Sequence, residues 1–262
     1  MTVGSYAKKP KLSVEFQWDG KTRLKNVYYT PPFKITSPFE TSSGRTKIIQ
    51  MSSSAGIMAG DCYEMNLKIG QKSRVEWTTQ SYEKIHKMNE NAHAQRTCSI
   101  RIERDSELVY FPQATIPFAN SDFDGRTSVS LEDETSRLVY TDILGCGRAA
   151  MGESFAWRNY RNVLHVYRGK RLIYRENLHL RPTVQKLDGI GFFEGQTHTG
   201  SMLLCGYSFD TDRLNGMIRE VNEKREVVCG MSRLWQGDYV IKCLGDRAQV
   251  IEDFFRDIIE IL

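Results

Sequence analysis

The sequence predicts an all-β protein of mainly antiparallel layered β-sheets, with roughly fourteen or more strands and two C-terminal α-helices. Short stretches in which apolar and polar residues alternate recur along most of the chain, and tight-turn residues separate them. Apolar residues at helical spacing occur only near the end. Because no low-complexity linker or exact repeat divides the chain, residues 1–262 are expected to form one domain.

Turn residues predict several hairpins. Asp19-Gly20 lies between KLSVEFQW and KTRLKNVYYT, which indicates two strands around a primed turn. Gly70 closes a turn between DCYEMNLKIG and SRVEWTTQS, and residues 168–170 join AWRNYRNVLHVY to RLIYRENLHL. Such short connections favour antiparallel sheets over alternating β-α units.

Two helices are expected near residues 210–224 and 246–261. In the first, the apolar residues from Leu214 to Val221 share one face. The second begins with Asp246-x-x-Gln249, which has the pattern of a capping box, and then carries a wide apolar stripe. Such a stripe usually docks on the protein's own core, and docking on a partner is the alternative.

The net charge of +4 is unevenly distributed. Residues 1–50 carry nine Lys/Arg against three acids, and residues 158–186 carry eight against one. The basic residues alternate with apolar ones, as on solvated strand faces, and no recognised motif accompanies them, so no nucleic-acid partner is expected. No apolar run reaches the roughly 20 residues that span a bilayer, and no secretory signal is visible. A soluble cytoplasmic protein without a membrane partner is the expectation.

Neither the cysteines nor the histidines form a strong metal pattern. The six cysteines have no short metal-binding spacing and are interpreted as small buried residues, not as disulfides or a zinc site. His86 and His93 lie seven residues apart in a polar segment expected to be a loop, where flexible imidazoles could bind nickel or zinc. Without a third ligand they are weak metal candidates.

Three carboxylates occupy unusual positions. Asp61 lies between a glycine turn and a strand, whereas Asp142 and Glu176 each share a strand face with apolar residues. An acid there is costly unless it is paired, hydrogen-bonded or hydrated. One interpretation is a buried ion pair with an arginine such as Arg148 or Arg175. The functional alternatives are paired acids for hydrolysis, or a polar conduit for a cation.

A proline-rich segment, TPPFKITSPF, must be an edge, bulge or loop because prolines lack the ladder donor. It is interpreted as a rigid connector, with an aromatic partner-binding segment around Phe33 and Phe39 as the alternative.

Six stretches occur in a fixed order along the chain: TPPFKITSPF, SSAGIMAGD, WTTQSYEKIH, YFPQATIPF, LVYTDILGCGR and IYRENLHL. Together they resemble the UreD family of urease accessory proteins, called UreH in Helicobacter, from about residue 12 to about residue 205. The resemblance is weaker over the C-terminal helices. It implies an unusual layered β structure with two helices.

The resemblance implies a urease maturation factor that is a scaffold and not an enzyme. Family members form a complex with UreF and the GTPase UreG and dock on apo-urease, so that Ni²⁺ is the cargo and no cofactor is tightly bound. A dimer formed through the accessory complex is also compatible. The resemblance further implies an internal polar passage for nickel and water, lined by Asp61, Thr79, Gln80, Ser81, Asp142 and Glu176. The alternative, from the carboxylates alone, is a β-fold carbohydrate-active hydrolase.

Overall fold

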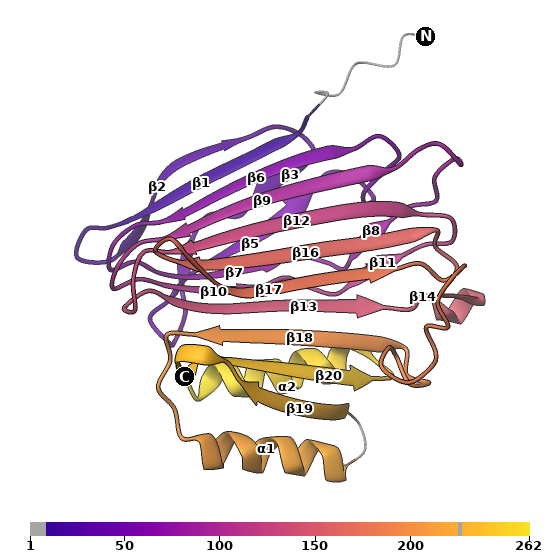
Figure 1. The fold of residues 1–262 in the computed structure, drawn as a ribbon. Helices are drawn as coiled ribbons and strands as arrows, with labels where there is room; N and C mark the ends of the chain where they lie inside the picture. The colour runs from indigo at the N-terminus through magenta and orange to yellow at the C-terminus, as the bar shows by residue number, and fades with distance from the viewer. Residues whose placement is uncertain (1–8, 225–226) are drawn as a thin grey trace, which may run out of the picture.

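The computed structural model describes residues 9–224 and 227–262, which form two stacked β-sheets and a helical layer (Figure 1). One sheet has seven strands and the other has eleven. Their facing sides enclose the larger apolar core. The helices pack on the opposite side of the eleven-stranded sheet and enclose a second core there. In the part of the chain described, the layers are therefore sheet, sheet and helices.

The seven-stranded sheet has the spatial order β17-β16-β12-β9-β6-β1-β2. In chain order its strands are β1 (Lys11–Trp18), β2 (Thr22–Tyr29), β6 (Cys62–Ile69), β9 (Ala94–Ile102), β12 (Asp122–Leu131), β16 (Asn159–Arg168) and β17 (Arg171–Leu180).

The eleven-stranded sheet has the main order β19-β20-β18-β13-β10-β7-β5-β3, and three short strands pair beside this path. In chain order its strands are β3 (Phe33–Ile35), β4 (Phe39–Glu40), β5 (Thr46–Ser52), β7 (Arg74–Thr79), β8 (Glu83–Ile85), β10 (Glu107–Phe111), β11 (Thr115–Pro117), β13 (Arg137–Gly145), β18 (His198–Cys205), β19 (Val227–Arg233) and β20 (Tyr239–Gly245). The remaining elements are the β14 (Gly147–Arg148) and β15 (Glu153–Ser154) ribbon, 3₁₀ turns at Ala149–Met151 and Trp235–Gly237, and helices α1 (Thr211–Glu223) and α2 (Ala248–Glu260).

Strand pairing differs from the mainly antiparallel arrangement that the sequence predicts. From β5 to β16 the long strands alternate between the sheets, so β6, β9, β12 and β16 pair in parallel, as do β5, β7, β10 and β13. The hairpins β1–β2 and β16–β17 are antiparallel as expected, but the turn at Gly70 crosses to the other sheet. The antiparallel prediction is wrong because a hairpin turn and a corner between two sheets use similar residues. The mostly β, layered character is confirmed.

The corners between the sheets stack on one another like the turns of a solenoid. Three of them end in a buried serine directly before a strand of the eleven-stranded sheet: Ser73, Ser106 and Ser136. Neighbouring corners are hydrogen-bonded, for example from Lys72 N to Arg104 O at 3.3 Å. The segments SRVEW, SELVY and SRLVY that begin at these serines pair in register and recur about every 30 residues. The fold therefore contains a degenerate repeat, which a search for exact repeats misses.

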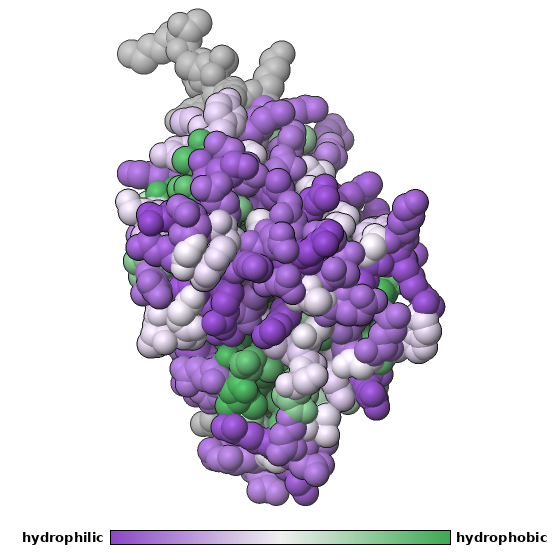
Figure 2. Space-filling model, turned by 90° about the vertical axis from the view of Figure 1, so that its left-hand side faces the viewer, coloured by the Kyte–Doolittle hydropathy of each residue, from purple (hydrophilic) through white to green (hydrophobic). Residues whose placement is uncertain are grey.

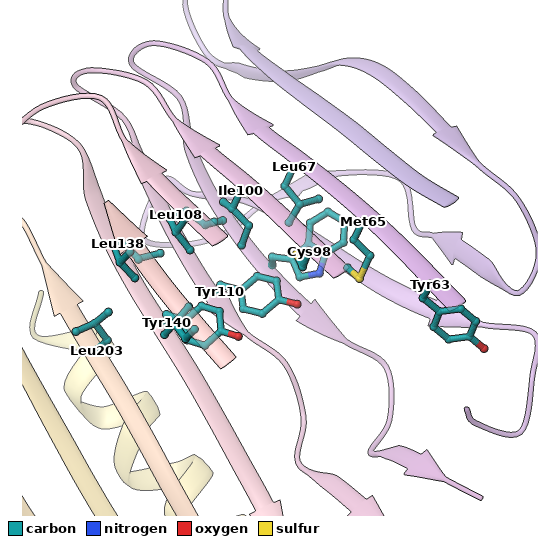
Figure 3. Close-up of a cluster of buried hydrophobic side chains, with 14 of the residues drawn as sticks. Tyr63, Met65, Leu67, Cys98, Ile100, Leu108, Tyr110, Leu138, Tyr140 and Leu203 are labelled. Carbon is teal, nitrogen blue, oxygen red and sulfur yellow. The ribbon is translucent and has the colours of Figure 1, made fainter. Parts of the chain in front are cut away.

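Identical ladder positions fill the larger core. Leu108 and Leu138 are direct neighbours on β10 and β13, and so are Tyr110 and Tyr140, whose rings stack with centroids 5.2 Å apart. Figure 3 shows these pairs facing side chains such as Leu67 and Ile100 of the other sheet. Because neighbouring strands run parallel and in register, residues of the same type lie next to each other and point into the same core.

Both helices lie where the sequence predicts them and dock on the protein's own sheet. Asp210 caps α1 by accepting a hydrogen bond from Asp212 N at 2.9 Å. α1 contacts β19, and α2 contacts β13, β18 and β20. The apolar stripe of α2 is buried against this sheet, which confirms the core-docking interpretation.

Two local details correct or decide the sequence interpretation. α2 begins at Ala248 with Arg247 at the N-cap, and among the described residues no side chain caps it. The Asp246 capping box is therefore wrong, because Asp246 lies one residue too early; its carbonyl instead accepts from Thr197 Oγ1 at 2.6 Å. In the proline-rich segment, Phe33 is buried against Tyr63 with ring centroids 5.1 Å apart, as a connector requires, whereas Phe39 is exposed.

The six cysteines, all within the described residues, are free thiols, and all except Cys62 are buried. Among the same residues, no helix has the length and apolarity needed to cross a membrane.

Candidate functional site

A row of mostly polar residues crosses the interior between the two sheets and ends at a partly exposed lysine. On the seven-stranded sheet it occupies direct neighbours across β6, β9, β12 and β16, namely Tyr63, Arg96, Gly125 and Asn162. On the eleven-stranded sheet it occupies direct neighbours across β13, β18 and β20, namely Asp142, Ser201 and Lys242. We call these seven residues the interior polar row. On the seven-stranded sheet its position follows from the parallel register, and on the eleven-stranded sheet from the antiparallel pairs β13–β18 and β18–β20.

The two halves of the row meet where Asn162 Nδ2 donates a hydrogen bond to Asp142 Oδ2 at 2.7 Å. Burial raises the pKa of Asp142 above its ordinary value, and the nearby carboxylate of Glu176 acts in the same direction. The hydrogen bond from Asn162 and the positive charges of Arg96 and Lys242 oppose this rise. Asp142 is thus a carboxyl group whose charge is stabilised by an amide and by more distant cations, not by a direct ion pair.

Two buried polar atoms beside Asp142 lack hydrogen-bond partners among the described residues: Asn162 Oδ1 and Tyr160 Oη. Asn162 is 7% exposed and Tyr160 is fully buried. Leaving such an atom unsatisfied costs about 1–3 kcal/mol, so each one calls for an explanation, of which a bound water or ion is one. The middle of the row therefore offers oxygen ligands that the protein itself does not use.

Gly125 keeps space open next to one of these atoms. A Cβ at this position would lie 2.6 Å from Asn162 Oδ1 and 2.9 Å from Phe123 Cε1. Glycine inside a strand lowers stability and commonly marks a close approach by another group. Here it leaves room for the Asn162 carboxamide within the interior polar row.

At one end of the row, Arg96 forms an ion pair with Glu83, through Nη1 and Oε2. Its guanidinium also lies over the Phe123 ring, 5.5 Å from the centroid. Burial would lower the pKa of Arg96, but the charge of Glu83 raises it above its ordinary value. The row thus contains a fixed positive charge that one carboxylate balances.

Beside this ion pair lies a small cavity of about 70 Å³, lined by Thr79, Gln80 and Ser81 together with Tyr63 and Glu83. The hydroxyl of Thr79 accepts from Gln113 N at 2.9 Å and donates to Ser81 O at 3.3 Å. The structure therefore brings the three predicted strand-end residues to one end of the interior polar row.

At the other end lies a larger cavity of about 550 Å³, and both Asp142 and Glu176 line it. Glu176 belongs to β17, the edge strand of the seven-stranded sheet, and its carboxylate accepts from Tyr174 Oη at 3.0 Å and Ser201 Oγ at 3.3 Å. Lys242 Nζ pairs with Glu176 Oε1. The two predicted acids thus share one cavity at the open edge of the sandwich.

Asp61 lies apart from this cavity and has a local structural partner. Its Oδ2 accepts from Met58 N at 2.7 Å, which closes the turn, and from Tyr63 Oη at 2.8 Å. Burial, followed by the hydrogen bond to Asp61, raises the pKa of Tyr63. Among the described residues, Asp61 therefore contacts the interior polar row through Tyr63.

The arginine partners suggested for the acids are wrong. Arg148 pairs with Glu153, with Nε 2.9 Å from Oε2, and stacks over Phe118. Glu176 has an ion-pair partner, but it is the Lys242 ammonium from the other sheet. Only the folded topology brings this lysine, 66 residues further along the chain, beside Glu176.

The two candidate histidines have separate partners. His86 Nε2 lies 3.2 Å from Ala55 O, and its ring packs edge-on against Phe118. His93 Nε2 lies 3.0 Å from Gln95 Nε2. Across residues 9–224 and 227–262, no cluster of three or more His, Cys, Asp or Glu side chains could hold a metal ion. A metal role for His86 and His93 stays a prediction.

Sequence reasoning missed Glu83, Arg96, Asn162 and Lys242. The signal was present for Arg96 and Asn162, since each shares a strand face with buried residues two positions before and after it. The inward-face criterion that selected Asp142 applies equally to them, although only acids were considered.

Comparison with known proteins identifies the class. The family model described as "UreD urease accessory protein" matches residues 8–262. The chain is 38% identical to the urease accessory protein UreD of Acetivibrio thermocellus, over 93% of each chain. It is 31% identical to the urease accessory protein UreH of Helicobacter hepaticus, over 98% of this chain and 99% of that one. The chain belongs to the UreD family of urease accessory proteins.

Proposed function

We propose that this protein is a cytoplasmic, non-catalytic scaffold that binds UreF and UreG, docks on apo-urease and carries Ni²⁺ along its interior polar row. Membership of the UreD family supports a role in urease maturation. The observation that carries the finer proposal is the pair of orphaned oxygens, Asn162 Oδ1 and Tyr160 Oη, beside the carboxyl group of Asp142.

The chemistry of the row suits transit better than storage. A site of several thiolates or imidazoles would hold nickel tightly, whereas dispersed carboxyl, amide and hydroxyl oxygens bind this borderline cation weakly. A cation moving from the larger cavity would pass Glu176, Asp142 and Asn162 and then meet the Arg96 guanidinium. Because that charge repels a cation, Arg96 must shift with Glu83 for passage to be completed.

The test uses Asp142→Leu and Asp142→Asn in cells that express urease with the accessory proteins. We expect Asp142→Leu to assemble normally but to yield urease with low nickel content, because it blocks water and cation together, and Asp142→Asn to be milder. Asp124→Leu is the matched control, since this β12 acid pairs with Arg126 at 3.0 Å on the outer face. Normal nickel loading by Asp142→Leu in an intact complex would contradict the passage.

A scaffold also needs a docking surface. Figure 2 shows an apolar patch at the level of the helices, with hydrophilic residues above and below it. A groove of about 1030 Å³ beside the end of α2 is lined by Phe111, Arg256 and Leu262, among others. We expect Arg256→Glu to reduce recovery of UreF in a pull-down, while Arg219→Glu, on the exposed side of α1, leaves it unchanged.

The maturation role itself is tested by deleting the whole chain. If urease activity is then unchanged, this role is wrong.

The hydrolase alternative has less support. Asp142 and Glu176 do share a cavity, as paired acids would. However, Lys242 Nζ already pairs with Glu176 Oε1 and lines the same cavity, so the two acids are not a free pair facing a substrate. Release of sugar from a glycoside by the purified chain, lost in Glu176→Gln, would reverse this preference.

A further inference from the structure

Lys242 occupies the mouth of the larger cavity in a way that the passage alone does not explain. Its ammonium pairs with Glu176 Oε1 and lies 2.9 Å from Ser201 Oγ. Ser201 in turn lies directly between Asp142 and Lys242 in the register of the eleven-stranded sheet. A positive group thus stands between two oxygen atoms, one from each sheet, two ladder positions from Asp142.

The residues that line the larger cavity carry more negative than positive charges. Among the residues that line it, Asp142, Glu176 and Glu194 are acids, and Lys242 is the cation. The lysine is therefore the group that offsets the negative potential of the cavity. Without it, the cavity would attract and hold a cation from solvent more strongly.

The contact is also easy to exchange. The side chain of Lys242 is 48% exposed and that of Glu176 is 25% exposed. An ion pair this accessible contributes little to stability, and the lysine stem can swing into water without leaving a buried charge behind. A divalent cation brings twice the charge to the same oxygens, so it can displace the ammonium where a monovalent ion cannot.

We propose that Lys242 is a tethered counter-cation at the mouth of the passage, which a divalent metal ion displaces to reach Glu176, Ser201 and Asp142. This inference rests on the proposed nickel passage and adds its regulation. The lysine excludes monovalent ions from the mouth and keeps the site weak, so that a metal ion enters by exchange and is not retained.

The test measures Ni²⁺ binding to the full-length chain by equilibrium titration in 0.15 M KCl. Lys242→Met should bind Ni²⁺ at least tenfold more tightly than the unaltered protein, and Lys242→Arg should bind it more weakly because a guanidinium can hold a carboxylate through two donors. The double variant Lys242→Met/Glu176→Gln should lose the gain. Lys170→Met removes the same charge from the exposed turn between β16 and β17 and should change nothing.

A purely structural role for Lys242 predicts a different pattern. In that case Lys242→Met lowers the thermal midpoint and leaves Ni²⁺ affinity unchanged, which overturns the proposal. A gain in affinity that persists in the double variant also overturns it, because the ion then binds elsewhere. If Lys242→Met binds Ni²⁺ more tightly but Asp142→Leu still loads urease normally, the exchange at Lys242 is supported and the nickel passage is refuted.

Discussion

Arg45 and Glu107 form a buried, bidentate ion pair between the start of β5 and the start of β10. Arg45 Nε lies 3.0 Å from Glu107 Oε2, and Arg45 Nη2 lies 3.0 Å from Oε1. The two residues are 4% and 2% exposed. Arg74 and Tyr207 add hydrogen bonds of 2.9 Å to the same carboxylate. The network joins non-adjacent strands of the eleven-stranded sheet, 62 residues apart in sequence.

Replacing Arg45 by methionine should destabilise the protein strongly. Loss of one partner leaves the Glu107 charge buried, which typically costs about 3–5 kcal/mol, and the remaining bonds from Arg74 and Tyr207 place the cost near the lower end. Urea denaturation followed by tryptophan fluorescence measures this change. Arg45→Met/Glu107→Leu should recover part of the loss, because no buried charge is then left unpaired; Arg74 also loses its partner, but its side chain is 44% exposed. A single variant as stable as the unaltered protein would contradict this account.

The same pair predicts loss of stability in acid. Burial alone would raise the pKa of Glu107, but its bonds to Arg45 and Arg74 lower it to about 2, from an ordinary value of 4.5. Because the folded-state pKa is depressed, the contribution is present above pH 4.5 and is lost as the pH falls from 4.5 toward 2. The loss is on the order of 3 kcal/mol.

Unfolding measured at several pH values in that window checks this expectation. Glu107→Gln removes the titrating group and should flatten the dependence. An equally steep loss of stability in Glu107→Gln would assign the acid sensitivity to other groups.

The fold was predictable in its elements but not in its pairing. Alternation identified the long strands, and helical spacing located α1 and α2, because these patterns depend on which residues face a core. A turn can return the chain to the same sheet or carry it to the other sheet. Which of the two occurs depends on contacts between neighbouring corners, such as the hydrogen bond from Lys72 N to Arg104 O. The degenerate repeat at Ser73, Ser106 and Ser136 was the sequence signal that could have indicated parallel coils.

Gly200 on β18 should be needed for docking of α2. A Cβ there would lie 2.6 Å from Ile251 Cγ2 and 3.2 Å from Phe255 Cζ. Overpacking of this kind usually costs about 1–3 kcal/mol, so Gly200→Ala should lower the thermal midpoint. Gly216→Ala on α1, where a Cβ would meet nothing within 4 Å, is the matched control and should be neutral or stabilising. Equal effects at the two positions would show that α2 packs less tightly than described.

The candidate site was predictable only in part. Asp142 and Glu176 were found because an acid on an apolar strand face is costly wherever the strand lies. Lys242 could not be found in the same way, since its relation to Glu176 depends on a contact between the edges of two sheets. Asp61 was found because it lies between a glycine turn and a strand. The structure explains this position locally, since the carboxylate accepts hydrogen bonds from Met58 N in the turn and from the hydroxyl of Tyr63.

That local role gives the last prediction. The Asp61 carboxylate accepts two hydrogen bonds, and those to charged groups contribute about 1.5–3 kcal/mol when well formed. Asp61→Ala should therefore destabilise the protein, and a double-mutant cycle with Tyr63→Phe should give a coupling energy of about 1 kcal/mol. Glu64→Ala, on β6 directly after Tyr63 but paired with Lys11 in solvent, should change stability little.

The nickel content of urease distinguishes this structural role of Asp61 from a role in lining the nickel passage. If Asp61 acts only through the turn and Tyr63, urease matured with Asp61→Ala should lose nickel in proportion to the accessory protein recovered, and no more. A coupling energy of zero together with nickel-poor urease from a fully recovered complex would instead place the Asp61 carboxylate in the path of the cation.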